Sequence, residues 1–164
     1  MAKHEVIITK DLEQRKLIVI REFDAPLNKV WDAWTQGALL DQWWAPRPYR
    51  AETRSMDFSE GGRWLYCMVG PSGDRTWCGV DFRTIVIHES FTNAVMFCDE
   101  AGVENKDLPK MYWSVVFTEQ GNTTKVTAEI SFDRTADMDT IIQMGFEAGY
   151  TMGLNNLEEF LAGK

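Results

Sequence analysis

REFDAPLNKVWDAWTQGALLDQWW, the stretch from Arg21 to Trp44, points most directly to the fold of this chain. Its first residues continue a strand. Asp24 and Pro26 then mark a helix start, because Asp caps a helix N-terminus and Pro loses no hydrogen bond in the first turn. The next apolar residues have the i, i+3, i+4, i+7 spacing of one helical face: Leu27, Val30, Trp31 and Trp34. The sequence therefore predicts a strand followed by a short helix.

A second short helix follows at once. Gly37 ends the first helix, and Pro46 and Pro48 stop the second, whose apolar residues are Leu39, Leu40, Trp43 and Trp44. We expect four tryptophans to seat these helices against one end of a sheet: Trp31, Trp34, Trp43 and Trp44. For the Trp43–Trp44 pair two interpretations stay open, a core anchor or a ligand clamp.

Most of the remaining chain alternates apolar and polar residues with the period of a β-strand. Polar or glycine-containing turns separate strand segments at 6–9, 17–23, 49–58, 62–69, 75–88, 91–98, 111–118 and 123–132. The turns are too short for crossover helices, so neighbouring strands are antiparallel and form a meander.

The last part of the chain predicts a long helix over 136–161, opened by Asp133 or Thr135 as cap. Its apolar face comprises Met138, Ile142, Gly145, Phe146, Gly149, Gly153, Leu157 and Phe160, and its opposite face carries Glu147, Thr151, Asn155 and Glu158. This amphipathic pattern predicts that the helix lies across the sheet. The fold class is therefore α+β.

Three glycines follow each other at i, i+4, i+8 on the apolar face of that helix: Gly145, Gly149 and Gly153. Each costs a helix about 1 kcal/mol relative to Ala, so something should offset the loss. One interpretation is close approach of the helix backbone to the sheet. The other is a void, sized for a ligand, where side chains are missing.

Strand positions facing such a void would mix small polar residues with large aromatic ones, as a mostly apolar binding pocket requires. Trp64, Tyr66 and Met68 share one strand face, and Ala51, Thr53 and Ser55 share another. Asp57 is in phase with Thr53, and Asp81 with Trp77. Both carboxylates are therefore weak candidates for a catalytic acid or base near the cavity.

Composition excludes several classes of partner. Asp and Glu number 25 against 17 Lys and Arg, so the net charge of −8 disfavours nucleic acid and anionic membranes. No apolar run approaches the roughly 20 residues of a membrane span, and no signal-peptide core opens the sequence. Three cysteines lack metal-ligand spacing and fit buried positions in a reducing cytoplasm: Cys67, Cys78 and Cys98.

The motifs of common catalytic, metal and cofactor sites are absent from the sequence. The two histidines, His4 and His88, have no ligand partners at metal spacing. No Gly-x-Ser-x-Gly motif occurs, and no helix follows the glycine turns at 60–62 and 70–73 to make a phosphate site. We expect no metal and no cofactor.

Motifs along nearly the whole chain are similar to the activator of heat-shock protein 90 ATPase homologue family of the START-like (SRPBCC) superfamily. They are REFDAP from Arg21, VWxAWT from Val30, LxxWWxP from Leu40, EGGxW from Glu60, the glycine Gly79, HESF from His88, and MGxxxGYxxxLxxL from Met144. One departure is Ser59-Glu60, because the family usually carries Arg just before the Gly-Gly turn.

The resemblance implies a helix-grip fold, in which a curved antiparallel sheet wraps around a long C-terminal helix. It also implies a hydrophobic cavity between sheet and helix that binds small apolar molecules. The chaperone-activating role belongs to eukaryotic members with a second domain, and no such domain is expected in these 164 residues. We therefore expect a single START-like domain over 1–164.

The leading prediction is a cytoplasmic protein that binds a small hydrophobic ligand. Its expected ligand-binding residues are Trp64, Tyr66, Trp77, Trp113, Phe146, Gly149 and Gly153. Two alternatives stay open: an enzyme of cyclase, dehydratase or hydrolase type that uses a cavity acid or base, and a chaperone-associated interaction module. Whether the chain is an enzyme is left open, with binding favoured. A second copy of the chain, in a homodimer, is a further candidate partner.

Overall fold

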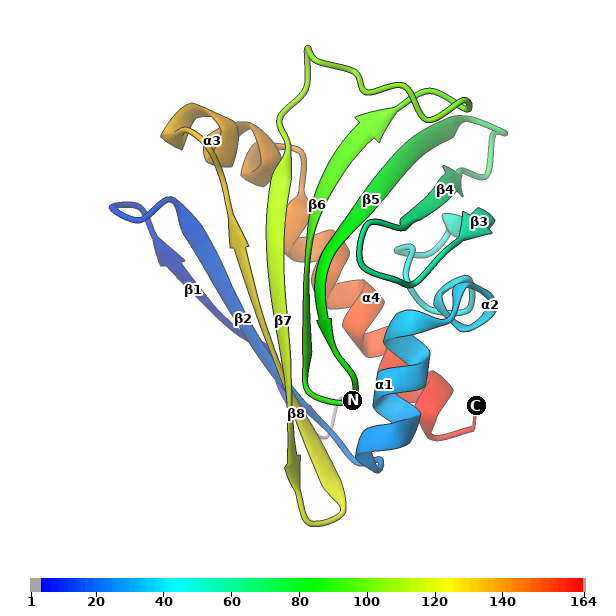
Figure 1. The fold of residues 1–164 in the computed structure, drawn as a ribbon, viewed down its shortest axis with the longest axis vertical. Helices are drawn as coiled ribbons and strands as arrows, with labels where there is room; N and C mark the ends of the chain where they lie inside the picture. The colour runs from blue at the N-terminus through cyan, green and yellow to red at the C-terminus, as the bar shows by residue number, and fades with distance from the viewer. Residues whose placement is uncertain (1–3, 164) are drawn as a thin grey trace.

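The computed structural model describes residues 4–163 as an α+β fold built on one eight-stranded antiparallel sheet (Figure 1). The strands are β1 (Ile7–Asp11), β2 (Lys16–Phe23), β3 (Arg50–Met56), β4 (Arg63–Val69), β5 (Arg75–Val86), β6 (Ser90–Cys98), β7 (Met111–Gln120) and β8 (Thr123–Ser131). They lie in the order β1-β2-β8-β7-β6-β5-β4-β3. The predicted strands are confirmed, and so is the meander, which runs from β3 to β8.

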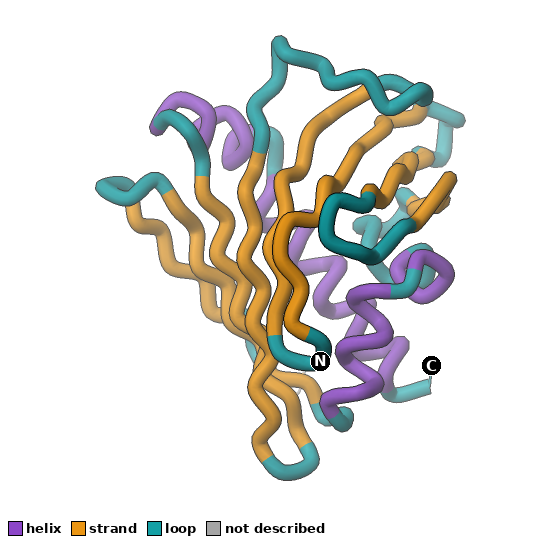
Figure 2. The backbone as a smooth tube through the Cα atoms, in the orientation of Figure 1, coloured by secondary structure: helices purple, strands orange, loops and turns teal. Residues whose placement is uncertain are grey.

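The helices lie on one side of this sheet. α1 (Leu27–Thr35) and α2 (Gly37–Leu40) connect β2 to β3, and α3 (Thr135–Gln143) and α4 (Phe146–Leu161) follow β8. The sheet bends around α4, which crosses its concave face, and α1 lies beside the C-terminal half of α4 (Figures 1 and 2). The predicted curved sheet around a C-terminal helix is therefore confirmed.

Alternation along the strands places one row of side chains under the helices. The row of β2 is buried and consists of Leu17, Val19, Arg21 and Phe23, and it pairs with the buried row Thr124, Val126, Ala128 and Ile130 of β8. The alternate residues are half-buried on the convex face. This two-sided pattern is what an antiparallel sheet with one covered face predicts.

Three tryptophans seat α1 and the segment after α2 against the sheet. Trp31 packs edge-on to Phe117 of β7 with ring centroids 5.0 Å apart, and Trp34 packs on Trp43 at the same distance. The indole N–H of Trp43 donates to the carbonyl of Ala33 at 2.9 Å, so its buried polar atom is satisfied. The predicted anchoring role is confirmed for these three. Trp44 also packs on Trp34 and on Trp64 of β4, with ring centroids 5.8 and 5.7 Å apart.

The C-terminal helix is not continuous. Gly145 separates α3 from α4 in a left-handed conformation, with φ 89°, which glycine adopts at little cost. The prediction of one helix over 136–161 was therefore wrong at this point.

The predicted helix caps were also wrong. Arg134 is the residue that precedes α3, and its side chain makes no capping hydrogen bond, so neither Asp133 nor Thr135 serves as the cap. At α1, Pro26 and not Asp24 occupies the position immediately before the first turn.

The C-terminal half of α4 packs tightly on the segment after α2. A Cβ built on Gly153 would lie 3.0 Å from the backbone oxygen of Trp44, so a side chain here would crowd that backbone and glycine allows the close approach. The side-chain amide of Asn156, which is buried, donates to the carbonyl oxygens of Trp43 and Ala45 at 3.3 and 3.1 Å. This half of the helix is therefore sealed by backbone contact and hydrogen bonds.

A buried arginine ties the same half of α4 to the sheet. Arg21 of β2 is 2% exposed, and its guanidinium donates to Asn155 Oδ1 at 3.0 Å and to Glu158 Oε1 at 3.1 Å. The sequence placed Asn155 and Glu158 on the face of the helix opposite its apolar residues. They serve there as hydrogen-bonding partners of the two terminal nitrogens of the guanidinium, whereas its Nε is buried without a partner.

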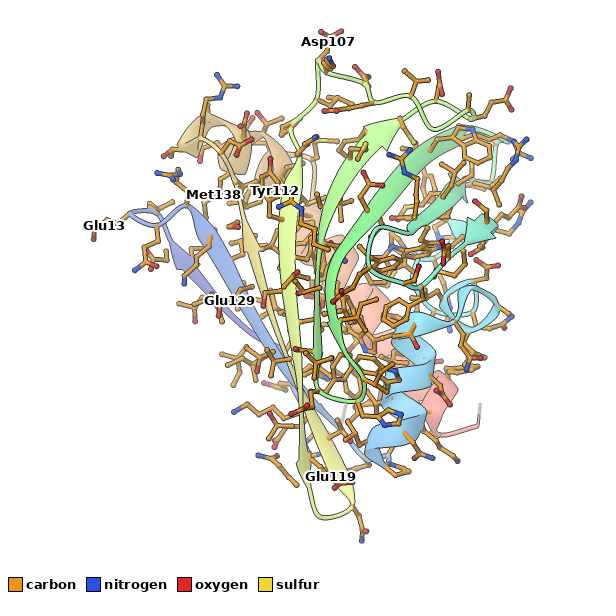
Figure 3. All side chains as sticks on the ribbon, viewed as in Figure 1. Glu13, Asp107, Tyr112, Glu119, Glu129 and Met138 are labelled. Carbon is orange, nitrogen blue, oxygen red and sulfur yellow. The ribbon has the colours of Figure 1, made fainter. Side chains whose placement is uncertain are left out.

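Acidic side chains occupy the ends of the sheet. Figure 3 places Glu13 at the β1–β2 turn, Asp107 on the loop between β6 and β7, and Glu119 near the β7–β8 turn. Met138 of α3, also labelled there, is fully buried and fixes that helix to the core.

Within residues 4–163, no helix is both long and apolar enough to cross a membrane.

Candidate functional site

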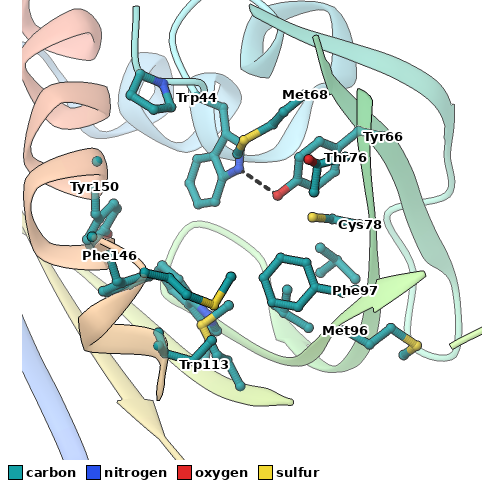
Figure 4. Close-up of a pocket in the computed structure, with 18 residues that line it drawn as sticks. Trp44, Tyr66, Met68, Thr76, Cys78, Met96, Phe97, Trp113, Phe146 and Tyr150 are labelled. Atoms are coloured by element: carbon teal, nitrogen blue, oxygen red, sulfur yellow. Dashed lines mark hydrogen bonds between the residues drawn. The ribbon is translucent and has the colours of Figure 1, made fainter. Parts of the chain in front are cut away.

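A cavity of about 220 Å³ lies between the N-terminal half of α4 and the concave face of the sheet (Figure 4). Strands β4 to β7 form its floor, α3 and α4 form one wall, and the segment after α2 forms the other. Its lining residues are Trp44, Pro46, Tyr66, Met68, Thr76, Cys78, Val80, Val95, Met96, Phe97, Met111, Trp113, Ile141, Met144, Gly145, Phe146, Gly149 and Tyr150.

The rim of the cavity is marked by those lining residues that are exposed to solvent. Met144 and Gly145 are exposed at the α3–α4 junction, and Thr76 is exposed at the start of β5. The break in the C-terminal helix at Gly145 therefore lies at the entrance. A continuous helix, which the sequence predicted, would follow a different backbone path at Gly145.

The lining contains no Asp, Glu, Lys, Arg or His. Its polar side-chain groups are the hydroxyls of Tyr66, Tyr150 and Thr76, the thiol of Cys78 and the indole N–H groups of Trp44 and Trp113. A few polar groups in an apolar and aromatic wall is the usual composition of a small-molecule site.

Tyr66 is held in place by two tryptophans. Its ring stacks on Trp64 with centroids 4.1 Å apart, and its hydroxyl accepts a hydrogen bond of 2.9 Å from the indole N–H of Trp44, drawn as a dashed line in Figure 4. Burial raises the pKa of Tyr66 well above its ordinary value, since the phenolate would lose its hydration. The phenol is therefore neutral at physiological pH.

Tyr150 faces the same space from α4. Its ring packs edge-on to Trp113 with centroids 5.2 Å apart, and burial alone raises the pKa of its phenol. Burial also raises the pKa of the Cys78 thiol to about 12. A thiol in that state is a poor nucleophile, because the thiolate is the reactive form.

The structure brings four of the predicted ligand-binding residues together around the cavity: Tyr66, Trp113, Phe146 and Gly149. Trp64 lines a smaller neighbouring cavity. Gly153 lines neither of these two cavities, since it lies against the backbone of Trp44. The two interpretations of the glycine stripe thus apply to different glycines: close approach at Gly153 and open space at Gly149, where a Cβ would meet only Pro46 Cγ at 3.8 Å.

Trp77 and Asp81 lie on the convex face, and the prediction that they face the cavity was wrong. They share a strand face as predicted, but Cys78 and Val80, the residues that alternate with them, point to the cavity. Trp77 stacks under the guanidinium of Arg54 at 5.7 Å. Asp81 accepts a hydrogen bond from Arg63 Nη2 at 3.0 Å.

Asp57 is likewise outside the cavity. A bulge between Thr53 and Ser55 shifts the register of β3, and the strand ends at Met56. Asp57 is exposed and accepts a hydrogen bond of 2.7 Å from the hydroxyl of Ser59. Neither candidate carboxylate is thus positioned to act on a molecule in the cavity.

Trp44 and Tyr150 are the most important lining residues that the sequence did not assign to the site. The two residues of the Trp43–Trp44 pair have different positions. Trp43 is 1% exposed and lies in the core, whereas Trp44 lines the cavity. Tyr150 lies four residues after Phe146, so helical spacing alone could have placed both on one face.

Metal binding finds no support in the described part of the chain. No group of three or more His, Cys, Asp or Glu side chains there could hold an ion. His88 is exposed, with φ 64°, and its ring packs edge-on to Trp31 with centroids 5.7 Å apart.

Comparison with solved structures shows the same fold over almost the whole chain. Protein Ms6760 from Mycobacterium smegmatis is 26% identical, with a TM-score of 0.88, over 95% of this chain and 96% of that one. A protein from Arthrobacter aurescens is 26% identical, with a TM-score of 0.91, over 96% and 92%. A protein from Staphylococcus epidermidis is 27% identical, with a TM-score of 0.83, over 95% and 93%.

Sequence comparison gives the family. No curated protein matches the chain. The profile described as activator of Hsp90 ATPase homolog 1-like protein matches residues 24–162, which include both short helices, β3 to β8 and the cavity. This chain therefore belongs to the activator of Hsp90 ATPase homolog 1-like family.

Proposed function

We propose that this protein binds a small, uncharged and mostly apolar molecule in the cavity under Gly149. The observation that carries the proposal is the cavity itself, about 220 Å³ of space in an otherwise closely packed interface. An apolar cavity of about 150 Å³ can hold benzene, so a molecule of one or two rings fits here.

The absence of charged groups from the lining sets the class of ligand. An ionised ligand would lose its hydration on entry and meet no opposite charge among the lining residues. Aromatic rings, in contrast, would find edge and face contacts with Trp44, Trp113, Phe146 and Tyr150. The ligand is therefore a neutral molecule with a ring system.

Binding rather than catalysis is the activity that this lining supports. The titratable groups of the lining are Tyr66, Tyr150 and Cys78, and burial raises the pKa of each. A general acid or base works best with a pKa near the operating pH, and none of the three meets that condition.

A substitution that fills the cavity tests the proposal. Leu at position 149 would project into the space that glycine leaves open, whereas Leu at the exposed position 148 adds the same side chain on the solvent side of α4. We expect wild-type protein and Ala148→Leu to bind 2-methylnaphthalene with one-to-one stoichiometry in equilibrium dialysis. Gly149→Leu should weaken binding at least tenfold.

Two results would contradict the proposal. One is no measurable binding to the wild-type protein, and the other is unchanged binding to Gly149→Leu. Circular dichroism and thermal unfolding of both variants show whether each retains the fold.

A further inference from the structure

A second, smaller cavity of about 30 Å³ adjoins the main one. Four residues line both: Trp44, Val80, Val95 and Trp113. The smaller cavity extends from this shared wall toward the helices, where its lining includes Trp34 of α1 and Leu40 of α2. The smaller cavity therefore lies directly against the main one, on the side of the helices α1 and α2.

Polar atoms without partners gather around this smaller cavity. Asn93 Oδ1, Trp34 Nε1 and Trp113 Nε1 are buried and have no hydrogen-bond partner, and all three residues line it. Asn93 is only 6% exposed. Buried polar side-chain atoms in native proteins nearly always have a partner. Three unpaired atoms around one small space indicate that the partner comes from outside the chain.

The other two tryptophans that line the smaller cavity, Trp44 and Trp64, do have hydrogen-bond partners. The indole N–H of Trp44 donates to the hydroxyl of Tyr66 at 2.9 Å, and that of Trp64 donates to Thr53 Oγ1 at 3.0 Å. Both residues also line the smaller cavity. Unpaired indoles are thus not a general property of this aromatic cluster.

The size and polarity of the space select one chemical group. A cavity needs about 10–15 Å³ to hold a water molecule, so the smaller cavity has room for a single hydroxyl but not for a further ring. A hydroxyl can donate to Asn93 Oδ1 and accept from an indole N–H, whereas a carbonyl can only accept. No cation or carboxylate lines the smaller cavity, so a charged group would be unpaired.

We propose that the ligand carries one neutral hydroxyl, which enters the smaller cavity and is recognised by Asn93 together with the indole N–H of Trp113. This inference rests on the proposed binding function and makes it specific: the ligand is a ring alcohol or phenol. Asn93 is the residue that distinguishes it from a hydrocarbon of the same shape.

The test compares 2-naphthol with 2-methylnaphthalene, which differ only in hydroxyl against methyl. Equilibrium dialysis gives the ratio of their dissociation constants for the wild-type protein and for Asn93→Leu. We expect the preference for 2-naphthol to fall about tenfold in Asn93→Leu, the value of about one neutral hydrogen bond, while binding of 2-methylnaphthalene is retained.

Asn156→Leu provides the matched control, because Asn156 is equally buried but already hydrogen-bonded and lines neither cavity. Its ligand preference should equal that of the wild type, since a ratio of two dissociation constants is not changed by a loss of folded protein. An identical preference in wild type and Asn93→Leu would overturn the inference and leave the binding function intact; a bound water as the partner of Asn93 would give this result. No binding of either compound would overturn both.

Discussion

The two halves of α4 meet the rest of the protein in opposite ways. At the C-terminal half, Gly153 brings the helix against the backbone of Trp44, and Asn156 hydrogen-bonds to two carbonyl oxygens. At the N-terminal half, Gly149 faces open space and Tyr150 borders a cavity. One residue type, glycine, thus serves close packing at one position and a void one turn earlier.

Close packing and a cavity therefore lie next to each other along one helix. The sealed half holds α4 in place through packing and through the hydrogen bonds of Arg21 and Asn156. The other half borders the cavity, and an unfilled void forfeits packing contacts.

The sealed half should be the most sensitive to substitution. Asn156→Leu removes the hydrogen bonds to the carbonyl oxygens of Trp43 and Ala45 and leaves both acceptors without this partner. We expect a loss of about 3 kcal/mol in the free energy of unfolding, measured by urea denaturation. Asn93→Leu, which removes an unpaired atom, should be neutral or stabilising. Equal losses in both variants would contradict the contrast between the two regions.

Alkaline pH should lower the stability of the folded protein through the two tyrosines that line the cavity. Tyr66 and Tyr150 have pKa values raised by burial, so the unfolded chain releases their protons at lower pH than the folded one. Stability is therefore complete below about pH 10 and falls above it, by about 1.4 kcal/mol per pH unit for each tyrosine. Tyr150→Phe should flatten the pH dependence between about pH 10 and 11; an unaltered slope would show that Tyr150 is not buried.

Gly153→Ala should destabilise the protein by about 1–2 kcal/mol. The added methyl would lie 3.0 Å from the backbone oxygen of Trp44, and this crowding exceeds the gain in helix propensity. Thermal unfolding measures the change. A stabilised Gly153→Ala would mean that the helix does not approach the backbone this closely.

Gly149→Ala should cause a smaller change of opposite sign. Its methyl would make an ordinary contact with Pro46 Cγ at 3.8 Å, so the helix gains about 0.5–1 kcal/mol. The same thermal unfolding experiment should show a slightly higher midpoint than wild type. A loss similar to that of Gly153→Ala would remove the distinction between the two halves.

Much of the fold followed from sequence periodicity, because strand alternation and turns act locally. The same logic failed at Gly145, whose left-handed conformation breaks the C-terminal helix, since glycine fits both a helix and a break. For Trp77 and Asp81, alternation correctly gave a shared face but could not say which face is covered. That choice depends on where the helices pack.

The site was only partly predictable for a related reason. Tyr66, Trp113, Phe146 and Gly149 stood out as aromatic or missing side chains on inward positions. The different roles of Trp43 and Trp44 depend on the path of the chain after α2, and the unpaired Oδ1 of Asn93 depends on its neighbours across the sheet. Neither leaves a pattern in the sequence.

Occupation of the cavity can be observed at individual tryptophans, by following their indole N–H resonances in an NMR titration with 2-methylnaphthalene. Trp44 and Trp113 line the cavity, whereas Trp43 lies in the core and Trp77 on the convex face. We predict that the signals of Trp44 and Trp113 shift with one binding constant while those of Trp43 and Trp77 stay unchanged. Shifts confined to Trp77, or none at all, would contradict a ligand cavity under Gly149.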